Sequence, residues 1–133
     1  MNRHHVLDAY GCHLHVATDR RGWATLRRRL PGLVDGPAPE SAGWTRFAAW
    51  QPKSGITVPV VVVYINAAQH TAPVDLIDTA AHEAAHVVSA LMDHIGHTIS
   101  GIDEPSAYLV GWVTAWLWGA ASDQPVTADR TAR

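Results

Sequence analysis

The first clear pattern along the chain is an alternation of apolar and polar side chains over residues 10–17. A period of two is that of a β-strand with one face in the core. On this prediction His13 and His15 share the polar face, where imidazoles are usually solvated but could also bind a metal ion. The apolar face is then formed by Tyr10, Cys12, Leu14 and Val16.

Two later segments are also predicted to be strands. Residues 44–50 form the first, and residues 56–65 form the second after a turn. The second is apolar on both faces, which is typical of a strand that is covered on both sides. Pro59 lacks the N–H that a sheet ladder requires, so we expect this strand near an edge or a bulge.

Helical spacing of apolar residues begins after the first strand. Trp23, Leu26 and Leu30 predict a helix that starts at an N-cap formed by Thr18 or Asp19. The next segment, residues 31–43, is rich in Pro and Gly and is predicted to be a loop, with the length of a flap.

Two more helices are predicted in the second half. One begins near Pro73 and ends at Gly96, and the other spans about residues 105–121. The last helix is apolar nearly all round and too short to span a bilayer, so it is either central to the core or docked on a partner. Its candidate face for self-association or for a partner protein comprises Trp112, Trp116 and Trp118.

The length and the net charge of the chain limit the classes of protein to which it can belong. A chain of 133 residues forms one domain, predicted over residues 1–121 with a polar tail at 122–133. The formal net charge of −2 gives no reason to expect nucleic acid or a membrane as partner. An alternative is that the arginine-rich face of the first helix binds nucleic acid. A solvated face of an amphipathic helix explains the same arginines better in a chain of this net charge. Without a signal-peptide pattern or a second Cys beside Cys12, we expect a cytoplasmic protein.

The strongest chemical signal is His-Glu-x-x-His at residues 82–86, inside the helix that begins near Pro73. One helical turn separates His82 from His86, so both imidazoles leave the same face and can share one Zn²⁺ ion. Glu83 can reach a water molecule on that ion and act as its general base. Thr79 and Asp93 lie on or beside this face and are candidates to orient the ligands.

A catalytic zinc ion usually has three protein ligands and one open position. The downstream candidates for the third ligand are His94, His97, Asp103 and Glu104. His94 and His97 fall in the last turn of the helix or just after it, where turning back to the same ion is difficult.

With this motif the chain resembles the zincin metallopeptidases over about residues 58–113. Metzincins place Gly and His where this chain has Ser89 and Met92, which excludes that branch. Gluzincins carry a Glu at the start of a following helix, and this resemblance implies Glu104 as third ligand, with Asp103 as the alternative. Tyr108 lies where gluzincins often have an Asp, and it is a candidate to orient Glu104 or to stabilise an oxyanion.

The resemblance implies an α+β fold: a minimal zincin-like domain in which a sheet of about three strands packs on the motif helix and a C-terminal ligand-bearing helix. It implies a zinc-dependent peptide-bond hydrolase acting on a peptide or protein substrate. In zincins the strand before the motif helix pairs with the substrate, here residues 58–65. The short chain is also similar to small zincin-like proteins encoded by phages and prophages. That similarity leaves a virion-associated binding or assembly module with structural or vestigial zinc as the alternative function.

A different zinc amidase, peptide deformylase, combines the same motif with an upstream Cys ligand. Residues 11–14, with Cys12, faintly resemble that arrangement. However, Cys12 falls on the apolar face of a predicted strand, and the assignment leaves Glu104 without a role.

Overall fold

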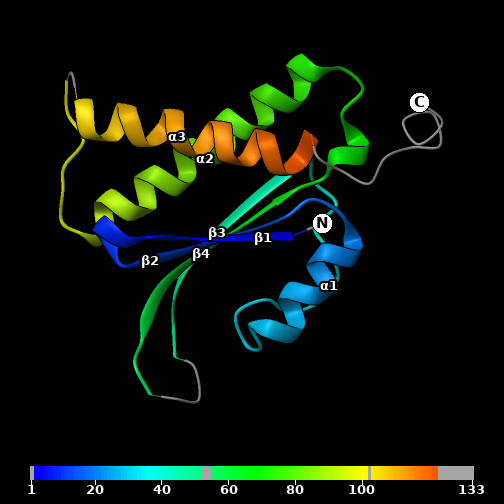
Figure 1. Ribbon diagram of the computed structural model, residues 1–133, viewed down its shortest axis with the longest axis horizontal. Coiled ribbons are helices and arrows are strands. Elements are labelled where there is room, and N and C mark those ends of the chain that lie inside the picture. Colours follow the sequence, from blue (N-terminus) through cyan, green and yellow to red (C-terminus); the bar gives the residue numbers. More distant parts are fainter. Residues whose placement is uncertain (1, 52–54, 102, 123–133) are drawn as a thin grey trace.

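A four-stranded mixed sheet forms the middle layer of the structure (Figure 1). The computed structural model describes residues 2–51, 55–101 and 103–122. The strands lie in the order β1-β2-β4-β3, with β2 and β4 parallel and the two outer strands antiparallel to their inner neighbours. Their bounds are Asn2–Leu7 for β1, Cys12–Ala17 for β2, Gly43–Trp50 for β3 and Val58–Ile65 for β4.

Helices cover both faces of this sheet. In Figure 1, α2 (Pro73–His94) and α3 (Glu104–Ser122) lie on one side of the strands and α1 (Arg20–Arg29) on the other. Two short 3₁₀ helices, η1 (Asp8–Tyr10) and η2 (Ala67–Gln69), join the elements. The predicted α+β class is confirmed, although the sheet has four strands rather than about three.

The hydrophobic core is divided by β4, whose successive side chains point to opposite faces. Val61, Val63 and Ile65 pack in the cluster that α2 and α3 cover. On the other face, Val60, Val62 and Tyr64 pack with Trp23 and Leu26 of α1. The apolar run was therefore predicted correctly as a strand that is covered on both sides.

The predicted edge position of this strand is wrong, because β4 lies between β2 and β3. Pro59 is tolerated because β4 extends beyond β2 at this point. Pro59 pairs with Ala49 of β3, whereas pairing with β2 begins only at Val60. Pro59 thus has a sheet neighbour on one side only, which satisfies the rule for proline locally.

The additional strand, β1, lies at the far edge of the sheet beside β2. Its sequence, Asn-Arg-His-His-Val-Leu, is too polar to stand out as a strand, as is common for edge strands that face solvent. Pairing with β1 places His4 directly opposite His15. His15 is not solvated as predicted but buried, because the second face of β2 lies under α1.

The loop between α1 and β3 is held down rather than free to act as a flap. Leu33 and Val34 are buried in the cluster under α1. The indole Nε1 of Trp23 donates a hydrogen bond to the carbonyl of Gly36 at 3.1 Å. Arg46 of β3 donates one to the carbonyl of Leu33 at 2.8 Å. These bonds tie the loop to α1 and to β3, the strand that borders the candidate site.

The three tryptophans of α3 do not form one face. Trp112 and Trp116 stack with ring centroids 6.3 Å apart, and the Trp112 ring lies 4.7 Å from that of His5 in β1. Trp118 points elsewhere and borders a hollow beside η2. The helix includes Ser122, and the rest of the predicted tail lies outside the described residues. Within the described ranges, no helix has the length and apolarity to cross a membrane.

Candidate metal centre

The motif lies in the middle of α2, which has well-defined ends. Pro73 occupies the first helical position, where its missing N–H costs nothing. At the other end Gly96 adopts a left-handed conformation with φ of 76°, and the N–H of His97 donates to the carbonyl of Met92 at 2.8 Å. This Schellman arrangement ends the helix where the sequence predicts.

His82 and His86 point toward one another on the exposed side of α2. Their Nε2 atoms are 3.2 Å apart and their rings are nearly perpendicular, at 73°. Two nitrogen ligands of a tetrahedral zinc ion, each about 2.0–2.1 Å from the metal, are separated by about 3.3 Å. The two imidazoles therefore already have the spacing that such an ion requires.

Glu83 completes this cluster from a buried position. Its carboxylate and the two imidazoles offer ligand atoms that all lie within 4.8 Å of one another. The side chain is only 3% exposed, and the hydroxyl of Thr45 in β3 donates a hydrogen bond to its Oε2 at 3.1 Å. A buried carboxylate with little hydrogen bonding is costly, and a nearby cation offsets that cost. The donor set thus fits a zinc ion.

Glycine 43 allows β3 to approach the motif closely. A Cβ atom at this position would lie 2.9 Å from Cγ of Glu83 and 2.9 Å from Cγ2 of Thr79. Real Cβ atoms essentially never show such distances, so only glycine fits without a shift of the Glu83 and Thr79 side chains or of the elements that carry them. Its role is steric, because the φ angle of Gly43 is not positive.

The cluster opens into a hollow of about 470 Å³ between α2 and β3. Its floor is formed by the motif and by the first half of β3, and its lining residues are Gly43, Trp44, Thr45, Phe47, His82, Glu83, His86 and Ala90. A larger hollow of about 860 Å³ lies beside η2, the start of α2 and Trp118. Its lining is mainly apolar and contains none of the histidine pair, so we place the chemistry in the smaller hollow.

Thr79 contacts His70 rather than a histidine of the motif. Its hydroxyl is 2.7 Å from Nε2 of His70, whose Nδ1 is 2.8 Å from the carbonyl of Asn66. Because a carbonyl only accepts, Nδ1 of His70 carries the hydrogen and Nε2 accepts from Thr79. Thr79 therefore anchors the η2 segment to α2. Asp93, the other residue predicted to orient the ligands, is exposed near the end of the helix.

The structure does not bring Glu104 to the histidine pair. α2 continues eight residues beyond His86, or about 12 Å of helix rise, before the chain turns toward α3. Glu104 is the first residue of α3, is exposed, and does not belong to the cluster around His82. The assignment of Glu104 as third ligand stays a prediction.

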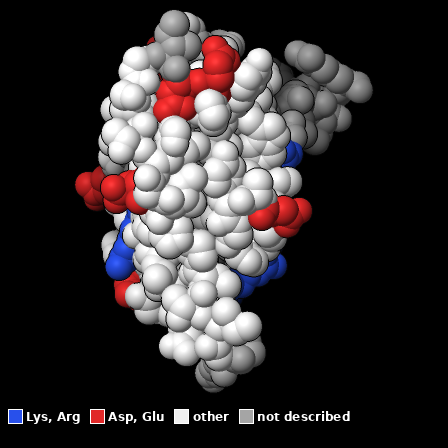
Figure 2. Space-filling model, turned by 90° about the vertical axis from the view of Figure 1, so that its left-hand side faces the viewer, with Lys and Arg blue, Asp and Glu red and all other residues white. Residues whose placement is uncertain are grey.

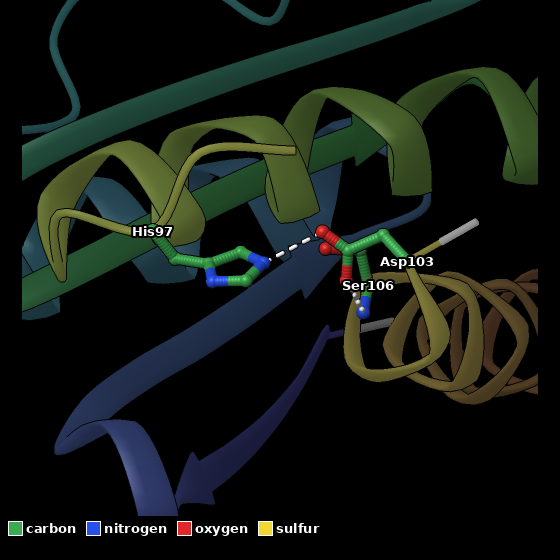
Figure 3. A network of polar contacts seen from close by, with 3 residues as sticks. All are labelled: His97, Asp103 and Ser106. Carbon is green, nitrogen blue, oxygen red and sulfur yellow. Dashed lines mark hydrogen bonds and ion pairs between the residues drawn. The ribbon is translucent and has the colours of Figure 1, made fainter. Parts of the chain in front are cut away.

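Asp103, the alternative ligand, has structural partners instead (Figure 3). Its Oδ2 accepts a hydrogen bond from Nε2 of His97 at 2.6 Å, and its Oδ1 accepts one from the backbone N–H of Ser106 at 3.1 Å. The bond to His97, and then that to Ser106, holds the pKa of Asp103 below its usual value. Asp103 thus caps α3 and ties its start to His97, in the connection that follows α2.

Other candidates also lie away from the cluster. Tyr108 is 77% exposed and does not line the hollow. The ring of His94 packs against Phe47, with centroids 5.2 Å apart. Cys12 is fully buried in the cluster under α2 and α3, and burial raises the pKa of its thiol to about 11. A thiol that resists deprotonation in the core is a poor metal ligand, which argues against the deformylase alternative.

Comparisons with known proteins leave the chain without an identified relative. A scan against protein-family models and searches of curated proteins and of solved structures found no match.

The charged side chains add no further indication of function. On the face drawn in Figure 2, Lys and Arg side chains lie at the margins and are separated by uncharged surface. In α1, Arg27 donates a hydrogen bond to the carbonyl of Gly36 at 3.0 Å.

Proposed function

We propose that this protein is a zinc-dependent hydrolase of peptide bonds, in which His82 and His86 hold the ion. The observation that carries the proposal is the convergence of these imidazoles with the buried carboxylate of Glu83, all within 4.8 Å. An isolated pair of surface histidines does not need a buried carboxylate beside it. A hydrolytic metal site does, because a proton must be moved there.

Zinc, when bound, would lower the pKa of a water molecule to about 7 and polarise a substrate carbonyl. Glu83 is placed to act as the general base, and would take up a proton from a water molecule that attacks the substrate carbonyl. The hydroxyl of Thr45 holds Oε2 of Glu83 and so fixes the direction of the carboxylate. Protonated Glu83 then gives the proton to the amine that leaves, which returns the carboxylate to its starting state.

The substrate is proposed to be an extended peptide segment paired with β3. β3 is the edge strand of the described sheet that lies beside α2. Gly43, Trp44, Thr45 and Phe47 of this strand line the hollow. An edge strand offers backbone hydrogen bonds to a peptide that adds to the sheet. This assignment replaces residues 58–65 as the substrate-pairing strand, because both edges of β4 already pair with neighbours.

Hydrolysis of a peptide library tests this proposal. We expect the zinc-loaded chain to cleave library members, as detected by mass spectrometry, and a chelator to stop the cleavage. The variant His86→Ala should lose it, whereas His94→Ala should keep it. His94 is the matched control because it is exposed on the same helix but lies outside the cluster. Equal cleavage by both variants would refute the proposal and point to a contaminating peptidase.

A second candidate function is a zincin-like binding or assembly module. The observation that favours it is the exposed position of Glu104 and Tyr108, away from the histidine pair. Such a module would retain zinc on His82 and His86 and would cleave no member of the peptide library. Zinc binding without cleavage is therefore the result that selects this function.

A further inference from the structure

A second group of metal-binding side chains lies in the β1–β2 hairpin. His4, His13 and His15 offer ring nitrogens that all lie within 4.8 Å of one another. His13 and His15 project from the face of β2 opposite to Leu14 and Val16, which pack beneath α2 and α3. This cluster is therefore on the α1 side of the sheet, on the opposite face from the one that α2 covers.

The three rings are already close together. Nε2 of His4 is 3.0 Å from Nδ1 of His13, close to the separation of about 3.3 Å between two nitrogens on a tetrahedral ion. The His4 ring lies nearly parallel to both others, with centroids 5.1 Å from His13 and 4.3 Å from His15. Because these rings are stacked, they must rotate about their side-chain torsions to direct three lone pairs at one ion.

His15, the most buried of the three, has one ring nitrogen that lacks a hydrogen-bond partner among the described residues. His15 is 8% exposed, and its Nδ1 is buried without a hydrogen-bond partner among the described residues. A buried polar atom without a partner is destabilising, and each one in a native structure calls for an explanation. An imidazole that binds a metal ion is one such explanation.

The pKa values of two of these rings are lowered. Burial, followed by the nearby His4, His13 and Arg29, lowers the pKa of His15 to about 4. The pKa of His4 is also lowered, first by burial and then by His13, His5 and Arg29. Arg29 is exposed, and its charge is therefore screened by solvent.

We propose that His4, His13 and His15 form a second metal site, which binds one divalent transition-metal ion of the class that prefers imidazole, such as Cu²⁺ or Zn²⁺. Three imidazoles are the ligand set that suits these ions, with a fourth position left for solvent on the exposed side of His4. The bound ion joins edge strand β1 to β2. The site is independent of the proposed hydrolase, because it shares no residue with the cluster around Glu83.

The test uses the full chain carrying His82→Ala and His86→Ala, so that the first cluster cannot contribute. Cu²⁺ is titrated into this protein, and the bound ion is examined by electron paramagnetic resonance, which reports the number of nitrogen ligands. His4→Ala and His13→Ala are then compared with His5→Ala. His5 is the matched control because it neighbours His4 in β1 but points toward Trp112 of α3.

We expect one ion per chain with three nitrogen ligands, and an affinity at least ~10-fold lower in His4→Ala and in His13→Ala. His5→Ala should bind as the parent does. The His4→Ala and His13→Ala variants replace side chains that are not fully buried, so both are expected to fold. Circular dichroism checks that they do. Equal Cu²⁺ affinity in all three variants, or no bound ion in the parent, would overturn the proposal.

Discussion

Replacing Glu83 by Gln is expected to slow hydrolysis by orders of magnitude while leaving zinc in place. Glutamine has the same shape and can still accept the hydrogen bond from Thr45, but it cannot take up a proton. General-base catalysis contributes about 10²–10⁴-fold to rate, so kcat should fall by that factor. The measurement is the cleavage rate of a peptide identified in the library, together with the zinc content of the same preparation.

Asp75→Asn provides the matched control for this experiment. Asp75 is an exposed acid in the first turn of the same helix, seven residues before His82, and its replacement removes the same charge. Its cleavage rate should stay near that of the parent. If Glu83→Gln cleaved peptide at the parental rate, Glu83 would not be the base, and the proposed reaction would be wrong.

The substitution Gly43→Ala should damage both stability and hydrolysis. Its methyl group would lie 2.9 Å from Cγ of Glu83 and from Cγ2 of Thr79, so these side chains, or the elements that carry them, must shift. Overpacking of this kind costs about 1–3 kcal/mol of the free energy of unfolding, measured by urea denaturation. Because Glu83 is one of the two residues displaced, the cleavage rate should fall as well.

Gly111→Ala is the control for the general effect of replacing glycine. Gly111 lies in α3, and a Cβ atom there would meet nothing within 4 Å. Alanine is the better helix former, so this variant should gain about 0.5–1 kcal/mol. Equal free energies of unfolding for the two variants would show that the close approach of β3 to Glu83 is not tight.

The elements that local patterns specify were largely predictable. Asp19 was one of two candidate caps for α1, and its Oδ1 accepts a hydrogen bond from the N–H of Gly22 at 2.6 Å. The start of α2 at Pro73 and its stop at Gly96 follow from the fixed φ of proline and from the left-handed conformation that glycine allows. The proximity of His82 and His86 was predictable because one helical turn separates them.

Features that depend on the order of the strands were not predictable. Nothing local indicates that β3, rather than β4, forms the edge beside α2, so the strand lining the hollow was misassigned. The burial of His15 depends on α1 packing over β2, a contact between separate segments. In the same way, the position of Glu104 depends on where α3 begins relative to α2, which the spacing of the motif does not determine.

The central claim is that His82 and His86 hold one zinc ion, and zinc content by elemental analysis tests it most directly. The full chain, purified without chelator, is measured beside His82→Ala/His86→Ala, with Glu104→Ala and Asp103→Ala to identify a third ligand. Because the β1–β2 hairpin is a second proposed site, the informative quantity is the difference between parent and double variant. We predict a difference of one zinc ion per chain, and loss of zinc from either single variant would identify that residue as a third ligand. The same zinc content in the parent and in the double variant would contradict the claim.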